Sequence, residues 1–239
     1  MADAPLLAVD ALRVEYDGVP AVHEVSLEIR AGEIVALVGA NGAGKSSTLR
    51  AIAGAARPAA GEIRLDGERV DGLEAHEIVA RGIAHVPEGR RLFGPMTVEE
   101  NLRLGASQVK DRAEIARRLE RMGQMFPVIA SRAGQRADTL SGGEQQLVAV
   151  ARGLMSEPRL ILLDEPSLGV MPLVVGQLYE LVRTLADEGV AVIVADQNLE
   201  RLLRLADRAY VFRTGVVVLE GTGAELLDSP EVREAFLGI

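Results

Sequence analysis

Hydrophobic residues recur along this chain with different spacings in different regions. Near the N-terminus, β-prone runs at residues 6–16 and 22–29 lie on either side of Asp17 and Gly18, a pair that favours a turn. Strands prefer residues of this kind when turn residues bound them. The pattern therefore predicts two short strands joined by a turn.

A second group of apolar runs shows no alternation with polar residues. Such runs indicate strands that helices cover on both faces, as in a parallel sheet. They lie at residues 34–38, 160–163 and 190–194. Shorter strand-like segments that end at loops or turns lie at residues 81–87, 210–212 and 216–219, and a helix-like tail closes the chain.

Residues 97–155 have helical spacing. The apolar positions on one helix face are Ile115, Leu119, Met122 and Phe126, and we interpret them as core packing. Ser141 and Glu144 form the Ser-x-x-Glu pattern of a capping box, and an apolar stripe follows them. A helix is therefore predicted to begin at Ser141. The whole pattern is that of an α/β protein with a helical insertion.

Composition narrows the class of protein. Of the 239 residues, 48% are apolar and 26% are charged, as in ordinary globular proteins. The formal net charge of -9, without a basic cluster, argues against nucleic acid as a partner. The chain contains no cysteine and therefore no disulfide or thiolate metal site. Its apolar runs are shorter than the roughly 20 residues that cross a bilayer, and residues 1–10 lack the features of a signal peptide.

A glycine-rich loop carries the first chemical motif. Residues 39–46 match the phosphate-binding pattern GxxxxGK(S/T), after the apolar run and before a helix-like segment at 45–53. Glycines allow consecutive backbone N–H groups to surround phosphates, and the helix start adds a favourable dipole. Lys45 is expected to contact the phosphates and Ser46 to bind Mg²⁺. The residues expected to hold the nucleotide here are Gly39, Asn41, Gly42, Ala43, Gly44, Lys45, Ser46 and Ser47.

Two carboxylates follow the strand expected at residues 160–163. Asp164 would hold Mg²⁺, commonly through water, and Glu165 would polarise the attacking water. Taken alone, a strand that ends in Asp-Glu is unremarkable. Because the phosphate-binding loop is also present, the pair indicates a P-loop NTPase in which Glu165 and Lys45 are catalytic.

A second glycine-containing helix start decides the class of NTPase. The string LSGGEQQ at residues 140–146 places Ser141, Gly142, Gly143 and Glu144 at the predicted helix start, which makes a second anion-binding terminus. A plain capped helix is the alternative interpretation. The string lies shortly before a strand that ends in Asp-Glu-Pro, and this combination is similar to the signature of ABC ATPases. The resemblance covers essentially the whole chain.

The resemblance implies a fold and a shared site. ABC ATPases have the P-loop NTPase fold with a RecA-like core, an antiparallel β subdomain and a helical subdomain. Here a single domain, residues 1–239, would have its nucleotide-binding core and β subdomain at 1–86 and 159–239 and its helical subdomain at 87–158. In the family two ATPase domains pair head to tail, so signature residues 141–144 would act on ATP held by a partner chain.

Tyr16 precedes the loop at the place where ABC domains have an aromatic residue that stacks on adenine. Stacking tolerates different ring types and is worth about 1–3 kcal/mol for bases on aromatic side chains. A core or surface tyrosine with no role in binding is the alternative, because the chain has only three tyrosines and the position alone does not distinguish them.

Three positions depart from the commonest ABC pattern. Glu88 stands where glutamine is usual, Gln197 where a switch histidine is usual, and Met171 where aspartate is usual; no histidine follows His85. Either the site binds ATP and hydrolyses it poorly, or these residues are characteristic of one subfamily. A glutamine amide still donates to a γ-phosphate and a glutamate still binds Mg²⁺. Because Glu165 and Lys45 are intact, we expect hydrolysis, with Gln197 catalytic and Glu88 near the metal.

The same positions narrow the resemblance. The segments VPEGRRLF, MTVEENL, DEPSLG and the pair Gln197-Asn198 resemble one ATPase subunit of branched-chain amino acid importers. The ATPases of urea and amide importers are the main alternative. The resemblance implies ATP and Mg²⁺ as cofactors, a homo- or heterodimer of ATPases, membrane permeases, an indirectly coupled periplasmic solute-binding protein, and a cytoplasmic place on the inner face of the membrane. Glu88 and the helical insertion would meet the permeases, and a solvated basic turn is the alternative for residues 89–91.

Two functions of other classes are the further alternatives. An ABC ATPase of DNA repair or translation usually has coiled-coil insertions or basic linkers, and this acidic chain has neither. A regulatory subunit that binds ATP without hydrolysing it would differ in phosphate release from the assembled complex. The transported solute is not readable from the sequence, because ABC motor subunits do not contact it.

Overall fold

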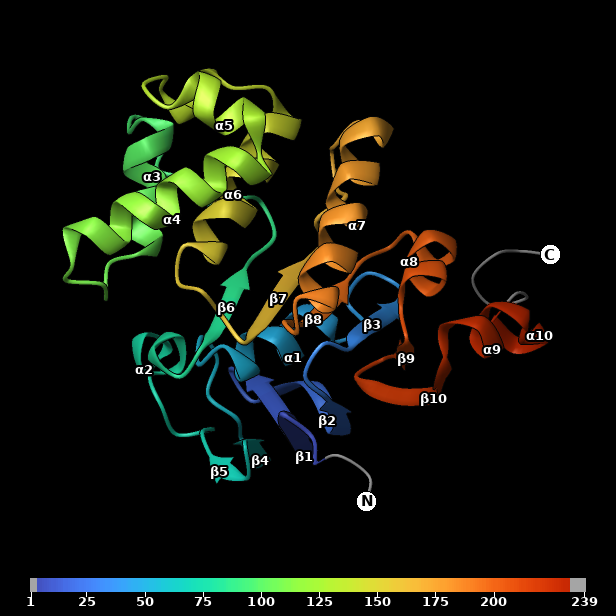
Figure 1. Cartoon of the computed structure of the whole chain (residues 1–239). Helices are drawn as coiled ribbons and strands as arrows, with labels where there is room; N and C mark the ends of the chain where they lie inside the picture. Colours follow the sequence, from blue (N-terminus) through green and yellow to red (C-terminus); the bar gives the residue numbers. More distant parts are fainter. Residues whose placement is uncertain (1–3, 233–239) are drawn as a thin grey trace.

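The computed structural model describes residues 4–232, which form two β-sheets with helices around them (Figure 1). The larger sheet has six strands in the order β10-β9-β3-β8-β7-β6. Its strands are β3 (Ile34–Gly39), β6 (Ile83–Val86), β7 (Leu160–Asp164), β8 (Ala191–Ala195), β9 (Arg208–Arg213) and β10 (Val216–Thr222). All neighbouring strands pair in parallel except β9 and β10, which form an antiparallel hairpin. The carboxyl ends of β3, β7 and β8 therefore meet at one edge.

The smaller sheet is antiparallel, in the order β2-β1-β4-β5. Its strands are β1 (Leu7–Tyr16), β2 (Val19–Ile29), β4 (Ala60–Leu65) and β5 (Glu68–Arg69). With α1 (Lys45–Ile52) it covers one face of the larger sheet. Val35 and Leu37 of β3 belong to that core, whereas Ile34, Ala36 and Val38 belong to a second core on the opposite face. Both faces of β3 are thus buried, which explains its unbroken apolar run.

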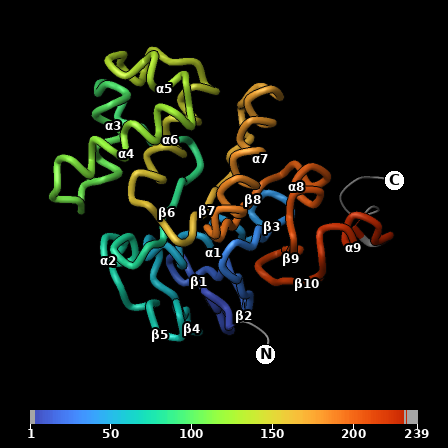
Figure 2. The backbone as a smooth tube through the Cα atoms, in the orientation of Figure 1, coloured from blue at the N-terminus to red at the C-terminus, as the bar shows by residue number. Residues whose placement is uncertain are grey.

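Most of the remaining helices cover the second face and extend beyond it, whereas the short helix Ala75–Ala80 packs Ile78 into the core of the first face. The remaining helices are α2 (Ala75–Ala80), α3 (Val98–Gly105), α4 (Arg112–Met125), α5 (Pro127–Arg132), α6 (Gly142–Leu154), α7 (Pro172–Asp187), α8 (Leu199–Leu205), α9 (Gly223–Asp228) and α10 (Pro230–Val232), with a 3₁₀ turn at Ala137–Thr139. Helices α3, α4 and α5 lie together on the side of the molecule away from the antiparallel sheet (Figure 2). Among the described residues, no helix is long and apolar enough to cross a bilayer.

The strands predicted from apolar runs are confirmed. The buried parallel strands predicted at residues 34–38, 160–163 and 190–194 are β3, β7 and β8, and the turn at Asp17-Gly18 joins β1 to β2. Ser141 caps α6 as predicted, and Met122 and Phe126 are buried in the core. Five elements were not predicted, namely β4, β5, α2, α7 and α8. The closing helices α9 and α10 match the expected tail up to residue 232, and residues 233–239 lie outside the described part. The division of the chain at residues 87 and 158 stays a prediction.

Candidate functional site

The glycine-rich loop connects β3 to α1 through a backbone that glycine makes possible. Gly44 has a φ of 107°, and a Cβ at this position would lie 2.9 Å from the carbonyl oxygen of Ala21. Gly39 ends β3 so close to β9 that a Cβ would lie 2.4 Å from the carbonyl oxygen of Phe212. Both positions therefore exclude other residues. The loop curls over the start of α1, where its free N–H groups favour an anion.

Lys45 lies inside this loop. Its side chain is only 3% exposed, and its Nζ donates to the carbonyl oxygens of Gly39 at 2.8 Å and Ala40 at 3.2 Å. The same ammonium lies 3.5 Å from Oε1 of Glu165. The Lys45 ammonium is thus held by neutral carbonyls and one carboxylate, all of which a phosphate can replace.

Ser46 and Asp164 form the part of the site suited to a metal ion. The Ser46 hydroxyl donates to Oδ1 of Asp164 at 2.8 Å, while Oδ2 of Asp164 is buried without a hydrogen-bond partner. Burial, followed by the nearby Glu88 carboxylate, raises the pKa of Asp164. An unpaired buried oxygen beside a hydroxyl fits Mg²⁺, which binds few protein oxygens and takes its other ligands from phosphate and water. Within residues 4–232 no cluster of three acidic, histidine or cysteine ligands offers another metal site.

Glu165 follows β7 in a strained conformation. Its φ is 49°, in the left-handed region that non-glycine residues rarely adopt, and its backbone N–H donates to Ala195 of β8 at 2.7 Å. The side chain is 6% exposed, and burial raises the pKa of its carboxyl group although Lys45 opposes the effect. A carboxylate with a raised pKa beside a phosphate-binding loop is suited to accept a proton near neutral pH.

One cavity of about 600 Å³ brings most of the predicted nucleotide-binding residues together. Tyr16 stands at its rim, 41% exposed, and Gln197 and Glu88 approach from the loops after β8 and β6. The full lining is Tyr16, Ala21, Asn41, Gly42, Ala43, Gly44, Lys45, Ser46, Ser47, Glu88, Glu165, Leu168 and Gln197. Its volume falls within the range of small-ligand sites. The structure thus assembles residues from five separate segments around the loop.

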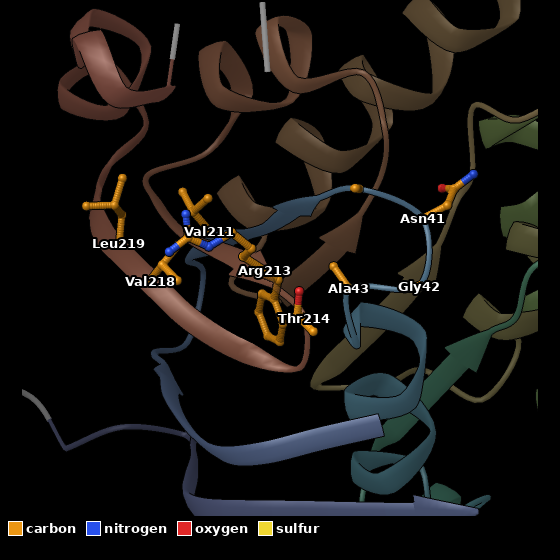
Figure 3. A pocket seen from close by; sticks show the side chains of 10 residues that line it. Asn41, Gly42, Ala43, Val211, Arg213, Thr214, Val218 and Leu219 are labelled. Atoms are coloured by element: carbon orange, nitrogen blue, oxygen red, sulfur yellow. The ribbon is translucent and has the colours of Figure 1, made fainter. Parts of the chain in front are cut away.

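A second cavity borders the same loop (Figure 3). Its volume is about 510 Å³, and it lies between Asn41, Gly42 and Ala43 on one side and strands β9 and β10 on the other. The turn between these strands contacts the loop directly, because the N–H of Gly215 donates to the carbonyl oxygen of Ala43 at 2.9 Å. The hairpin contributes Val218 and Leu219, so this cavity is mainly apolar. Sequence analysis did not predict it, because the β9–β10 hairpin meets the loop only in the fold.

The signature residues lie outside both cavities. Ser141 is exposed at the start of α6, where its hydroxyl accepts from the Glu144 N–H at 3.3 Å and its own N–H donates to the Glu144 carboxylate at 2.8 Å. Gly142 follows the cap, and Gly143 packs so closely that an added Cβ would lie 3.0 Å from Val174. The structure therefore does not bring residues 141–144 to the phosphate-binding loop of the same chain.

Asp196 is a buried residue of the site whose role sequence analysis missed. Its carboxylate accepts from the backbone N–H and hydroxyl of Ser167, at 3.1 and 2.6 Å, and from the N–H of Asn198 at 3.0 Å. It ties the loop after Glu165 to the loop that carries Gln197. An acidic residue directly after a buried strand was the available signal. Met171, in contrast, is 63% exposed and caps α7 without a side-chain hydrogen bond.

Comparison with known proteins identifies the family. Residues 22–168 match the ABC transporter family. The protein belongs to this family. The ABC ATPase is 46% identical over 233 residues to the high-affinity branched-chain amino acid transport ATP-binding protein BraG of Pseudomonas aeruginosa, covering 98% of this chain and all of BraG. It is 34% identical over 225 residues to the lipopolysaccharide export system ATP-binding protein LptB of Escherichia coli K12, with 93% of each chain covered.

Solved structures agree with the fold. The ABC ATPase matches the ADP conformation of MJ1267, an ATP-binding cassette of an ABC transporter, with a TM-score of 0.88 at 23% identity, covering 99% of this chain and all of that one. It also matches the dimeric ATP-binding cassette MJ0796 bound to ADP and Pi, with a TM-score of 0.82 at 26% identity over 93% of this chain and 99% of that one. The predicted P-loop ABC ATPase fold and ATP-hydrolysing class are confirmed.

Proposed function

We propose that this ABC ATPase powers import of a branched-chain amino acid through partner permeases. The observation that carries the proposal is one cavity lined by Lys45, Ser46 and Glu165, with Asp164 hydrogen-bonded to the Ser46 hydroxyl beside it. The solute is proposed from the similarity to BraG, which extends over the whole of that relative.

ATP would occupy the 600 Å³ cavity with its adenine on Tyr16 and its phosphates on the loop. Lys45 would then exchange its contacts with Gly39 and Ala40 for phosphate oxygens, and so leave Glu165 free to take a proton from the attacking water. Ser46 and Asp164 would hold Mg²⁺, which neutralises charge on the phosphates. The backbone of Gly39, Asn41, Gly42, Ala43 and Gly44, with Ser47, would complete the binding site.

The unusual residues fit retained hydrolysis. Gln197 borders the cavity, and its amide would donate to the γ-phosphate in place of an imidazole. Glu88 borders the cavity as well and influences the pKa of Asp164, so its carboxylate would lie close enough to help hold the metal ion. Met171 contributes nothing to the cavity, and we propose that the aspartate usual at this place is dispensable here.

The signature would serve a second chain. Ser141 is exposed and lies outside the cavity, so Ser141, Gly142, Gly143 and Glu144 are free to meet a nucleotide held by another ATPase. The dimeric state of MJ0796 supports such a pairing. The partner would be a second copy or a related ATPase subunit.

A hollow of about 400 Å³ on the same molecule is the proposed contact for the permeases. It lies where β6 meets α3 and α6, and His85, Phe93 and Arg152 help to line it. Phe93 is strongly exposed, as an interface residue would be. We propose that the protein sits at the cytoplasmic face of the cell membrane, that Glu88 and the helices after it contact permeases there, and that a periplasmic solute-binding protein delivers solute to the other side.

The catalytic proposal is tested with Glu165→Gln in the full chain. Loss of the base should lower phosphate release at least about 100-fold while binding of a fluorescent ATP analogue is retained, because the phosphate-binding loop is unchanged. Glu180→Gln, an exposed acid on α7, is the matched control and should behave as the parent protein. Parent-like phosphate release from Glu165→Gln would refute the assigned base. A parent complex with permeases that released no phosphate would favour the regulatory-subunit interpretation.

The solute is tested separately with the ATPases, permeases and binding protein reconstituted in vesicles. ATP-dependent uptake of leucine is expected. Uptake of urea or short amides without leucine would instead establish the second candidate, an ATPase of urea or amide importers, and would leave the catalytic proposal intact.

A further inference from the structure

The loop after β6 contains two consecutive residues in an unusual backbone conformation. Arg90 and Arg91 have φ angles of 63° and 47°, a region that side chains other than glycine and asparagine rarely adopt. Strain of this kind persists only where surrounding contacts hold it. Here Arg152 of α6 supplies such contacts, donating to the carbonyl oxygens of Arg91 at 2.8 Å and Arg90 at 3.2 Å.

The held conformation directs the Arg90 side chain between two motifs. One guanidinium nitrogen of Arg90 donates to Oε1 of Gln145 at 3.2 Å, within the signature helix. Another donates to the carbonyl oxygen of Gly169 at 3.2 Å, in the loop after Glu165. Arg90 is therefore the residue at which the loop after β6, the start of α6 and the loop after β7 meet. The alternative of a fully solvated basic turn is wrong for Arg90, although Arg91 is exposed.

Glycine at two neighbouring positions makes room for the guanidinium. A Cβ on Gly142 would lie 3.1 to 3.4 Å from three guanidinium atoms of Arg90, and a Cβ on Gly169 would lie 3.4 Å from one of them. The first distance is shorter than an ordinary van der Waals contact. The first glycine of the signature is thus packed against a side chain of its own subunit, besides any contact with a partner's nucleotide.

The acceptors of Arg90 are both uncharged. In residues 4–232, no carboxylate forms an ion pair with this guanidinium. A charged donor still forms strong hydrogen bonds with amide and carbonyl oxygens, and its planar fork fixes their direction. Arg90 therefore fixes the positions of Gln145 and Gly169 through directional hydrogen bonds and not through an ion pair.

We propose that Arg90 is a positioning residue that fixes the signature helix start of one subunit to the loop behind the catalytic Glu165 of the same subunit. The proposal rests on the proposed role of Ser141 and Gly143 in the partner's nucleotide site. Arg90 does not line the cavity around Lys45. It acts through its contacts with Gly142, Gln145 and Gly169. These contacts fix the position of the helix start that meets the partner's nucleotide relative to Glu165, the hydrolytic base.

This arrangement separates binding from turnover. One subunit binds ATP in a cavity that Arg90 does not touch, so removal of Arg90 leaves that step unchanged. Hydrolysis needs the paired site, whose two halves are in register only while the helix start and the loop at Gly169 move together. The proposal predicts that loss of Arg90 lowers kcat and changes the affinity of single subunits for nucleotide only slightly.

The test compares Arg90→Met and Arg90→Lys with Arg91→Met in the full chain. Arg91 is the matched control, because its side-chain hydrogen bond reaches only Glu88 in its own loop. Arg90→Met should retain binding of a fluorescent ATP analogue within about twofold and lose at least about tenfold in turnover at saturating ATP. Arg90→Lys should regain part of the turnover, because an ammonium keeps the charge but not the planar fork. Arg91→Met should match the parent.

Amide hydrogen exchange supplies a readout that does not depend on activity. In Arg90→Met, exchange should rise in residues 140–145 and 167–171 together, while the helices at 112–132 stay as in the parent. Turnover within twofold of the parent, or unchanged exchange in either segment, would overturn the proposal. Global loss of protection would also overturn it, since Arg90 would then be a general stability residue. A parent protein that pairs without hydrolysing ATP would refute the proposed function instead, and the exchange result would still decide the role of Arg90.

Discussion

At the scale of single residues, the site combines features that cost stability. Glu165 has a positive φ, and both it and Asp164 are buried carboxylates with raised pKa values. A raised pKa means that the folded state binds a proton more tightly than the unfolded state. These groups therefore lower the stability of the fold as pH rises from their unfolded pKa to their native pKa, and the full loss remains at higher pH. A strained backbone and buried polar atoms without partners lower stability, and proteins keep such features mainly at functional sites.

His85 leads to a prediction of the opposite sign. Burial, followed by the positive charge of Arg50, lowers the pKa of His85 to about 4, and its Nε2 has no hydrogen-bond partner among the described residues. The unfolded chain takes up this proton near pH 6.5, so stability should fall as pH drops from about 6.5 toward about 4. The contribution is about 1–3 kcal/mol, reduced from the full linkage value because the ring is only partly buried.

Urea unfolding between pH 4 and 7 measures this contribution. His85→Gln should flatten the acid side of the stability profile, since the titrating group is gone. His76→Gln is the control, because His76 is exposed on α2 and should leave the slope unchanged. Equal slopes for the parent and His85→Gln would show that other groups cause the acid sensitivity.

At the scale of elements, the same capping box begins α3, α6 and α9, and the first two of these helices have different proposed roles. Thr97 and Glu100 cap α3 with the same reciprocal hydrogen bonds that Ser141 and Glu144 form on α6. The two caps therefore have the same chemistry, but only Ser141 lies at the proposed interface with a partner's nucleotide.

Alanine at each cap should separate the two roles. Thr97→Ala and Ser141→Ala should each lower the free energy of unfolding by about 1 kcal/mol through loss of the cap. Only Ser141→Ala should also lower turnover, by at least about tenfold, because its hydroxyl would face the partner's phosphate. Thermal unfolding and phosphate release measure the two effects. Equal turnover in both variants would leave Ser141 with a purely structural role.

Local sequence signals predicted some elements and missed others for identifiable reasons. The Ser-x-x-Glu box marks the start of α6, and unbroken apolar runs mark strands buried on both faces. Helix α7 has no such start, since Met171 caps it without a side-chain hydrogen bond and Pro172 follows. Strand β4 was missed because its six residues, Ala60–Leu65, bury only two side chains and show a weak pattern.

In the site, too, the sequence predicted some features and missed others. Most residues that line the cavity belong to sequence motifs and were therefore predicted, whereas Ala21 and Leu168 were not. The links between motifs were not, because Arg90 contacts a residue 79 positions away and Asp196 one 29 positions away. No spacing rule relates residues so far apart, and only the parallel order of the strands brings them together. The positive φ of Glu165 likewise has no signal in residue type.

At the scale of the whole molecule, the proposed pairing implies that one chain holds two halves of different sites. Residues 141–144 do not line the cavity around Lys45, and Ser141 is exposed. Turnover per chain should therefore rise with protein concentration and reach a plateau once pairs form, since association follows mass action. Phosphate release measured from nanomolar to micromolar protein checks this. The same rate per chain at every concentration would mean that a single chain is a complete enzyme.

The burial of Lys45 has a practical consequence for this molecule. The chain has only two lysines, and the other, Lys110, is exposed in the link between α3 and α4. A protease that cleaves after lysine should therefore cut the native fold once, into residues 1–110 and 111–239, and spare the bond after Lys45, whose side chain is 3% exposed. Any cleavage after Lys45 would then report that the phosphate-binding loop has opened.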